Sequence, residues 1–169
     1  AESDVKPLSV AFVKGLLGYM LKESINYVNA LVLAEERGIR ISEVTTTQRG
    51  EYRNLIQVTC RTDAGVYRAD GTILEEKVPY VVRLEGCSLE FVPEGYLLVC
   101  RSIDRPGVVG NISTFLGARG INISGLRMGT TVPGEENISV YTLDRAPTAE
   151  VIDALCARSE IVSAKLIHV

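Results

Sequence analysis

A short glycine-containing loop is the part of this sequence best suited to bind a small charged molecule. The run Asp104-Arg105-Pro106-Gly107-Val108-Val109-Gly110 follows the apolar stretch Leu97–Cys100. A strand that passes through such a turn into a helix presents unpaired backbone N–H groups and a partial positive charge. These groups suit a carboxylate. No nucleophile, base and oxyanion donor can be assembled in the sequence, so it predicts binding of a small anionic ligand rather than catalysis.

The residues around this loop predict the elements that position it. Proline is tolerated in the first turn of a helix, so Pro106 and Gly107 are expected to open one. Gly120 is expected to close this helix, and Ile121–Ile123 to begin the next strand. The spacing of the apolar residues places one stripe along the helix, namely Val108, Ile112, Phe115 and Leu116.

The second half of the chain has the order strand, helix, strand, strand, helix, strand. We predict strands over 96–103, 121–131, 137–143 and 162–169, with Pro133-Gly134 as the turn between the middle two. The second helix follows Pro147, with Thr148 as its N-cap. This order is the ferredoxin-like βαββαβ arrangement. Its open sheet edges favour edge-to-edge dimerisation.

The first half is expected to be a helical pair packed on an antiparallel sheet. Helices are predicted over Pro7–Leu21 and Asn26–Arg37, and Gly38 is well placed to end the second one. The stripe of the first helix consists of Val10, Val13, Leu17 and Met20, widened by Phe12 and Leu16. Strands are expected over 39–46, 55–61, 66–74, 80–84 and 88–92. Pro93-Glu94-Gly95 marks the predicted boundary between an N-terminal domain, 1–94, and a second domain, 95–169, in an α+β protein.

Composition narrows the classes of function. The chain has 169 residues, a net charge of −3 and 46% apolar residues, which fits a globular protein. The negative charge argues against nucleic acid as a partner, and no apolar run is long enough to span a membrane. Four isolated cysteines and His168 predict no metal site, and a reducing compartment is expected. The start, Ala1-Glu2-Ser3-Asp4, shows no signal peptide and leaves open that this is a piece of a longer protein.

Two groups of motifs carry a resemblance to known families. The second half resembles an ACT domain, an amino-acid-binding regulatory module, through Asp104–Val108, Gly120–Ile123 and the βαββαβ plan. The first half resembles the intervening, or allosteric substrate-binding, domain of long-form D-3-phosphoglycerate dehydrogenases. The segments that carry this second resemblance are Gly15–Leu17, Asn26–Ala30, Ala34–Ile39, Gly71-Thr72, Val82–Gly86 and Pro93–Gly95.

The combined resemblance implies a regulatory region without a catalytic site. The family uses NAD to commit 3-phosphoglycerate to L-serine synthesis, in domains that would lie upstream. No GxGxxG motif follows a predicted strand here, which agrees with their absence from these residues. The resemblance also implies homodimerisation through ACT domains, a tetrameric parent, and a cytoplasmic location, or a plastid if the source is a plant.

The family's effector, L-serine, would lie between two subunits. Carried onto this chain, the N–H groups of Gly107 and Val108 would hold its carboxylate, and Asp104 its ammonium group. Asn122 of the other subunit, with Ile123 beside it, would contact both polar ends. The alternative for these residues is structural, with Asp104 capping the helix and Asn122 a strand end.

Other features keep competing hypotheses open. Serine-inhibited members often carry His or Tyr at the position of Ser102, which leaves the effector's identity open. Arg53 resembles a basic position of a proposed phosphate-binding site, and Arg49 lies nearby in the sequence. Arginine suits phosphate because its planar guanidinium group can bind two oxygens at once. As whole-chain alternatives, we consider a domain of an iron–sulfur L-serine dehydratase and a dimerisation module that responds to no amino acid.

Overall fold

The computed structural model describes residues 5–21, 24–46, 50–74, 77–129 and 135–169. The chain divides into two compact units, Ala1–Gly50 and Glu51–Val169, which are described separately. Four helices and two four-stranded antiparallel sheets are found in the described part, so the α+β prediction is confirmed. No helix within these residues is long and apolar enough to cross a membrane.

The first unit is a helical pair with a small core. Helix α1 (Lys6–Met20) and helix α2 (Ala30–Glu36) bury four residues, namely Val13, Leu17, Ala30 and Ala34. Gly38, at φ +70°, ends α2 as predicted, because Gly38 and Ile39 donate their N–H groups to the last turn of the helix. The predicted stripe of α1 is wrong at Met20 and Phe12, which are exposed.

Two further predictions for this unit are wrong. Helix α2 begins at Ala30 rather than Asn26, because Asn26 Oδ1 accepts the N–H groups of Val28 and Asn29 and forms a local turn instead. Residues 39–46 contain no strand, although their β-branched residues favour one. A strand needs a hydrogen-bonded neighbour. Every strand found in the described residues belongs to one of the two sheets, and the first of these strands begins at Leu55.

The second unit begins with a meander. Strands β1 (Leu55–Thr62), β2 (Gly65–Leu74), β3 (Val78–Leu84) and β4 (Cys87–Phe91) pair in sequence order. Short hairpins join β1 to β2 and β3 to β4, since Thr62 pairs with Gly65 and Leu84 with Cys87. Residues Glu85 and Gly86 of the second turn have φ values of +50° and +86°, as a type I′ turn requires.

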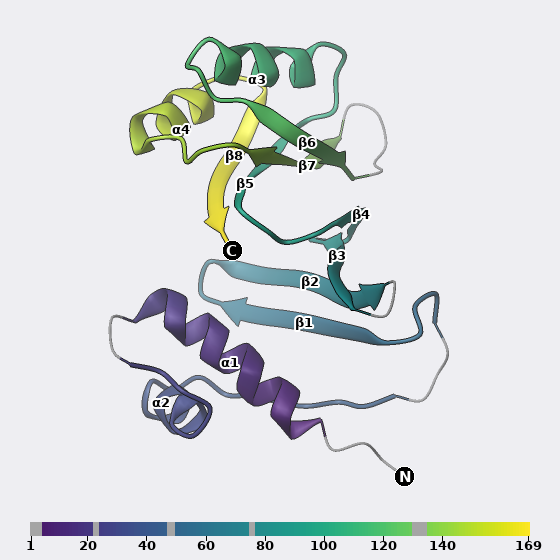
Figure 1. Cartoon of the computed structure of the whole chain (residues 1–169), viewed down its shortest axis with the longest axis vertical. Coiled ribbons are helices and arrows are strands. Elements are labelled where there is room, and N and C mark those ends of the chain that lie inside the picture. The colour runs from purple at the N-terminus through teal and green to yellow at the C-terminus, as the bar shows by residue number, and fades with distance from the viewer. Residues whose placement is uncertain (1–4, 22–23, 47–49, 75–76, 130–134) are drawn as a thin grey trace. The chain divides into compact units, whose positions relative to one another are not determined.

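The rest of the second unit is the predicted βαββαβ arrangement. It consists of β5 (Tyr96–Ile103), α3 (Val108–Gly117), β6 (Ile123–Met128), β7 (Glu136–Leu143), α4 (Ala149–Cys156) and β8 (Ile161–His168). The sheet order is β6-β7-β5-β8, with β6 and β8 at the edges. Figure 1 shows α3 and α4 on the same face of this sheet. The predicted turn at Pro133-Gly134 lies outside the described residues.

Burial of one face by the two helices holds this arrangement together. The predicted stripe of α3, Val108 to Leu116, is buried as expected, and Leu155 of α4 is fully buried. These side chains share a core with Leu98 and Tyr141 of the sheet. Helix α3 begins one residue after Gly107, not at Pro106, because Gly107 adopts a left-handed φ of +91° that a helix excludes.

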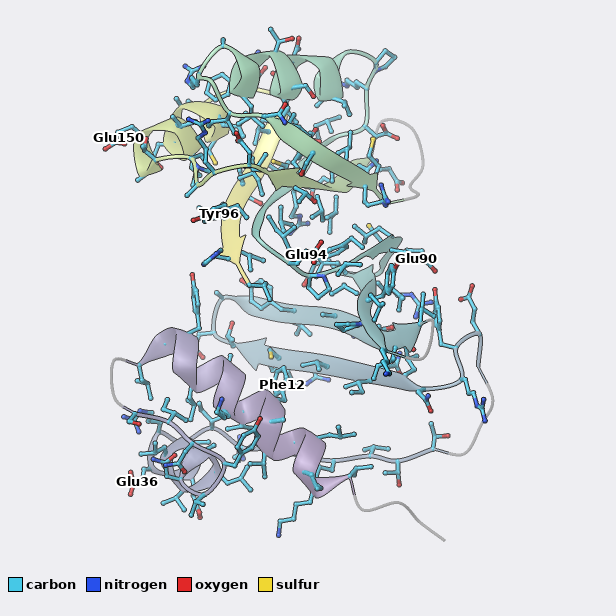
Figure 2. The ribbon with its side chains drawn as sticks, in the orientation of Figure 1. Phe12, Glu36, Glu90, Glu94, Tyr96 and Glu150 are labelled. Atoms are coloured by element: carbon cyan, nitrogen blue, oxygen red, sulfur yellow. The ribbon has the colours of Figure 1, made fainter. Side chains whose placement is uncertain are left out.

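Strand β4 of the meander packs on part of the opposite face of the same sheet. Leu89 of β4 packs against Leu97 and Val140, and all three are buried. Figure 2 labels Glu90 of β4. The carbonyl of Glu90 accepts a hydrogen bond from Nε of Arg127 on β6, at 3.1 Å. Strand β4 therefore covers part of this second face and reaches as far as the edge strand β6.

Candidate functional site

The loop after β5 has the geometry of an anion-binding helix start. The N–H of Asp104 continues the strand pairing, donating to Glu135 O at 2.8 Å, and the N–H of Val108 folds back to Arg105 O at 3.3 Å. No side chain caps α3, and its N-cap residue is Gly107. The N–H groups of the first turn therefore meet no capping side chain, and the helix dipole adds partial positive charge there.

Asp104 and Gly107 lie together on this loop as the sequence predicts. Asp104 is half-buried and already interacts within the molecule, while Gly107 is exposed and Val108 buried. The loop thus places a carboxylate next to a helix start with N–H donors. An amino-acid ligand needs this combination, since one end of it accepts hydrogen bonds and the other donates them.

Asn122 and Ile123 lie at the opposite end of the sheet from Asp104. Ile123 pairs with Leu143, which in turn pairs with Tyr96 at the beginning of β5, whereas Asp104 follows the end of β5. An eight-residue strand separates the two places, roughly 25 Å at about 3.3 Å per residue. The structure therefore does not bring the two halves of the predicted site together within one chain.

The backbone of Asn122 is held by Asp144. The N–H of Asn122 donates to Asp144 Oδ1 at 2.9 Å, and the N–H of Asp144 donates back to Asn122 O at 3.1 Å. The first of these bonds holds the pKa of the Asp144 carboxyl below its usual range, helped by Arg145. The exposed side chain of Asn122 makes no hydrogen bond to the described residues, so this clamp presents it to solvent.

This clamp is expected to depend on pH. A lowered folded-state pKa means that ionised Asp144 stabilises the fold above about pH 4 and that this contribution is lost as pH falls through the folded value. Asp144→Ala should therefore lower the melting temperature at pH 7, and the difference from wild type should shrink towards pH 3. Calorimetric scans at both pH values test this, with Asp153→Ala as the control for loss of an exposed carboxylate. A deficit that persists unchanged at pH 3 would contradict the role of the charge.

A row of buried polar residues lies beside the loop. Of these, the sequence analysis had singled out only Ser102. Ser102 pairs with Asn137 and Cys100 with Ser139. These four residues are at most 6% exposed. Next along the same strand, burial raises the pKa of Tyr141 to about 12, and the nearby Ser139 hydroxyl offsets part of this. The signal in the sequence is the alternation of Asn137, Ser139 and Tyr141 with the apolar residues Ile138 and Val140.

Comparisons with known proteins match two successive domains to this chain. Residues 1–85 match the family model of the D-3-phosphoglycerate dehydrogenase intervening domain, and residues 96–160 match the ACT domain. The chain belongs to the D-3-phosphoglycerate dehydrogenase family. It is the regulatory, ACT-containing region of such a protein.

Individual relatives support the same membership. The chain is 37% identical to a D-3-phosphoglycerate dehydrogenase of Methanocaldococcus jannaschii, over 86% of this chain and 27% of the relative. It is 31% identical to that of Bacillus subtilis over 98% of this chain and 33% of the relative. A Synechocystis dehydrogenase is 31% identical over 82% of this chain and 25% of its own length. The chain thus spans about a third or less of these curated relatives.

The domain limits can now be compared with these findings. The family models end at residue 85 and begin at residue 96, while the compact units of the structure meet between Gly50 and Glu51. Neither fixes a boundary at residues 94 and 95, so the predicted limits of this dehydrogenase-family chain stay a prediction.

Of the two arginines at the predicted phosphate site, the structure describes only one. Arg49 lies outside the described residues, and Arg53 is exposed in the segment before β1. The two residues before Arg53 are engaged elsewhere: Glu51 lies 3.9 Å from Arg83, and Tyr52 donates to Glu90 Oε1 at 2.7 Å. The hydrogen bond to Glu90 is the main reason that the pKa of Tyr52 is raised to about 12.

The cysteines and His168 are the remaining residues that could react or bind a metal. All four cysteines are free, and burial raises the pKa of the Cys100 thiol to about 12. His168 stacks on Tyr96 with the ring centroids 4.5 Å apart. Across the described ranges, no three His, Cys, Asp or Glu residues gather as metal ligands would.

Proposed function

We propose that this chain binds L-serine, or a closely related amino acid, at a site shared by two ACT domains and so mediates feedback control of serine biosynthesis. The observation that carries this proposal is the start of α3, where no side chain caps the helix. Gly107 has no side chain to block a ligand, and Asp104 lies in the same loop. The carboxylate would accept from the N–H groups of Gly107 and the helix start, and the ammonium group would donate to Asp104.

The distance between Asp104 and Asn122 supports a dimer as the binding form. Strand β6 is an edge strand, so two copies can pair through it. A two-fold axis makes the two β6 strands antiparallel, which carries Asn122 of one protomer towards the end of the sheet where the other's Asp104 lies. The exposed amide of Asn122 can then both donate to the ligand carboxylate and accept from its ammonium group.

The wider assignment follows the family. The parent protein would be an NAD-dependent phosphoglycerate dehydrogenase, with its nucleotide site in domains other than those described here. We propose a tetrameric parent in the cytoplasm or a plastid, and an accessory anion site at Arg49 and Arg53. Because the matched relatives are dehydrogenases, they favour this assignment over an iron–sulfur dehydratase.

Binding is expected to raise the stability of the chain in a stereospecific way. L-serine at about ten times its Kd should add about 1.4 kcal/mol to the free energy of unfolding, by mass action. Calorimetric melting with L-serine, D-serine, glycine and L-alanine measures this shift. Asn122→Ala should abolish the shift, whereas Thr114→Ala, an exposed polar change further along α3, should preserve it.

Light scattering on the same samples gives the oligomeric state. A dimer that shifts with no amino acid would contradict effector binding and leave a dimerisation module. A monomer that binds L-serine would contradict the shared site.

A further inference from the structure

Strand β1 is a sheet edge that lacks the usual protection against pairing. It is the outer strand of the meander and pairs with β2 in an unbroken register along its whole length. Natural edge strands are commonly blocked by lysine, proline or a bulge. The edge strand β8 has Lys165 and an irregular register opposite Ser102, whereas β1 has none of these features and one charged residue, Arg61.

The side chains at this edge leave apolar surface exposed. Leu55 and Ile56 point to opposite faces of β1 and both are exposed, as are Tyr67 and Ile73 on the neighbouring strand β2. An unpaired edge is a template for a further strand, and exposed apolar surface is typical of an interface. The edge is therefore suited to another extended segment that pairs with β1.

The hairpin determines which residues of β1 can pair outwards. The turn Asp63-Ala64 has only two residues, so Thr62 and Gly65 on either side of it must be a hydrogen-bonded pair. Such pairs alternate with non-hydrogen-bonded ones along an antiparallel ladder. The N–H and C=O groups that point away from β2 are therefore those of Leu55, Gln57, Thr59 and Arg61.

These outward groups are complementary to those of a second copy of the chain. Two antiparallel β1 strands related by a two-fold axis can be centred on Val58. This register pairs Gln57 with Thr59 of the other copy, and Leu55 with its Arg61. All the outward N–H and C=O groups are then satisfied, and the two copies of Val58 face each other as a non-hydrogen-bonded pair. No two like charges lie opposite each other along the strand.

Charges just outside the strand favour the same register. Arg53 lies five residues before Val58, and Asp63 lies five residues after it. Both charged side chains are exposed, and neither has an ion-pair partner in the described parts of the chain. Centring on Val58 therefore brings Arg53 of each copy opposite Asp63 of the other, at both ends of the interface. A register displaced by two residues would lose this match.

We propose that β1 is an interface at which a second copy of this chain pairs antiparallel about Val58. The pairing joins two four-stranded meanders into one continuous sheet. It needs neither β6 nor an amino-acid effector, so it is independent of the proposed effector site. A chain with two different two-fold interfaces, one at β1 and one at β6, can close into a tetramer.

Velocity sedimentation of the whole chain tests the charge match, in a buffer without phosphate so that no anion occupies Arg53. Asp63→Arg places like charges opposite each other at both ends and should raise the dissociation constant of this pairing about tenfold. Arg53→Asp should do the same, and the two changes combined should restore the wild-type value. Asp153→Arg, at an exposed position on α4, is the control and should leave the value unchanged.

A disulfide trap gives a second readout that locates the register. In a Cys60→Ser background, Val58→Cys should link two copies under mild oxidation, because facing residues of a non-hydrogen-bonded pair have Cα atoms about 4.5 Å apart. Mass spectrometry should find the bond between the two copies of position 58. Val66→Cys, exposed on β2, should give no such bond between its own copies.

The inference is overturned if Val58→Cys gives no linked dimer, or if both single charge variants associate as wild type does. Neither result bears on L-serine binding, which is measured on its own. Restored association in the combined charge variant, together with the bond at position 58, would support pairing through β1 in the stated register.

Discussion

Alanine in place of Gly129 is expected to lower the free energy of unfolding by about 2–3 kcal/mol, the upper part of the range for overpacking a closed site. A Cβ at this position would lie 2.7 Å from the Cβ of Cys87 on β4. Both atoms are attached directly to backbone, so no flexible side-chain end can move aside. The N–H of Gly129 is also held by Ile138 O at 2.8 Å, which opposes movement of its own chain.

The clash should disappear when the opposing atom is removed. In urea denaturation, Gly129→Ala should cost clearly less in a Cys87→Gly background than in wild type, because residues in direct contact are energetically coupled. Gly117→Ala is the matched control: it lies in α3 with nothing within 4 Å of the new Cβ. That change should stabilise the chain by about 0.5–1 kcal/mol.

Equal costs for Gly129→Ala in the two backgrounds would contradict the contact between β4 and the end of β6. The contact matters because Leu89, Leu97 and Val140 pack on the same side of the sheet. A loosened β4 would expose that apolar cluster, and Arg127 would lose its bond to Glu90 O.

Sequence predicted the elements best where local signals mark both of their ends. Strand β5 matches its predicted range, 96–103, because Pro93-Glu94-Gly95 precedes it and the Asp104 loop follows it. The start of helix α3 was misplaced by two residues, since proline and glycine together indicate a turn as readily as a helix start. Helix α2 lost its first turn to side-chain hydrogen bonds that Asn26 and Asn29 make to the backbone.

In the candidate site, too, the features set by local sequence were predictable and those set by strand pairing were not. The loop Asp104–Val108 was predictable because its residues are consecutive and their backbone conformation is local. The polar row was not, because it depends on Ser102 being paired with Asn137 across two strands that are remote in sequence. The separation of Asp104 from Asn122 likewise follows from sheet order, which no single segment specifies.

Removal of Arg83 is expected to cost about 2–3 kcal/mol, because it leaves a buried carboxylate without its cation. The side chain of Asp70 is 8% exposed and accepts from Arg83 Nη1 at 2.8 Å and from Gln57 Nε2 at 3.1 Å. The three residues lie directly opposite one another on β1, β2 and β3. Arg83 is itself 35% exposed, which keeps the expected cost below the largest known for buried pairs.

A second ion pair, on the other sheet, allows the energetic effect of burial to be separated from that of charge. Arg101 and Glu136 are joined at 2.6 Å but are 46% and 45% exposed. Arg101→Met should therefore cost no more than about 1 kcal/mol, against the larger cost of Arg83→Met. Adding Asp70→Asn to Arg83→Met should recover much of the loss, since a neutral amide tolerates the buried position better than an uncompensated charge.

Equal costs for the two arginine changes in urea denaturation would show that burial of Asp70 does not govern the energy of this cluster. The contacts of Arg83 also concern the proposed anion site. Arg83 reaches Glu51 as well as Asp70, and the Thr72 hydroxyl donates to Asn54 O. The segment carrying Arg53 is therefore tied to the meander on both sides of that residue. Loss of Arg83 should loosen this segment and weaken any binding of inorganic phosphate that depends on Arg53.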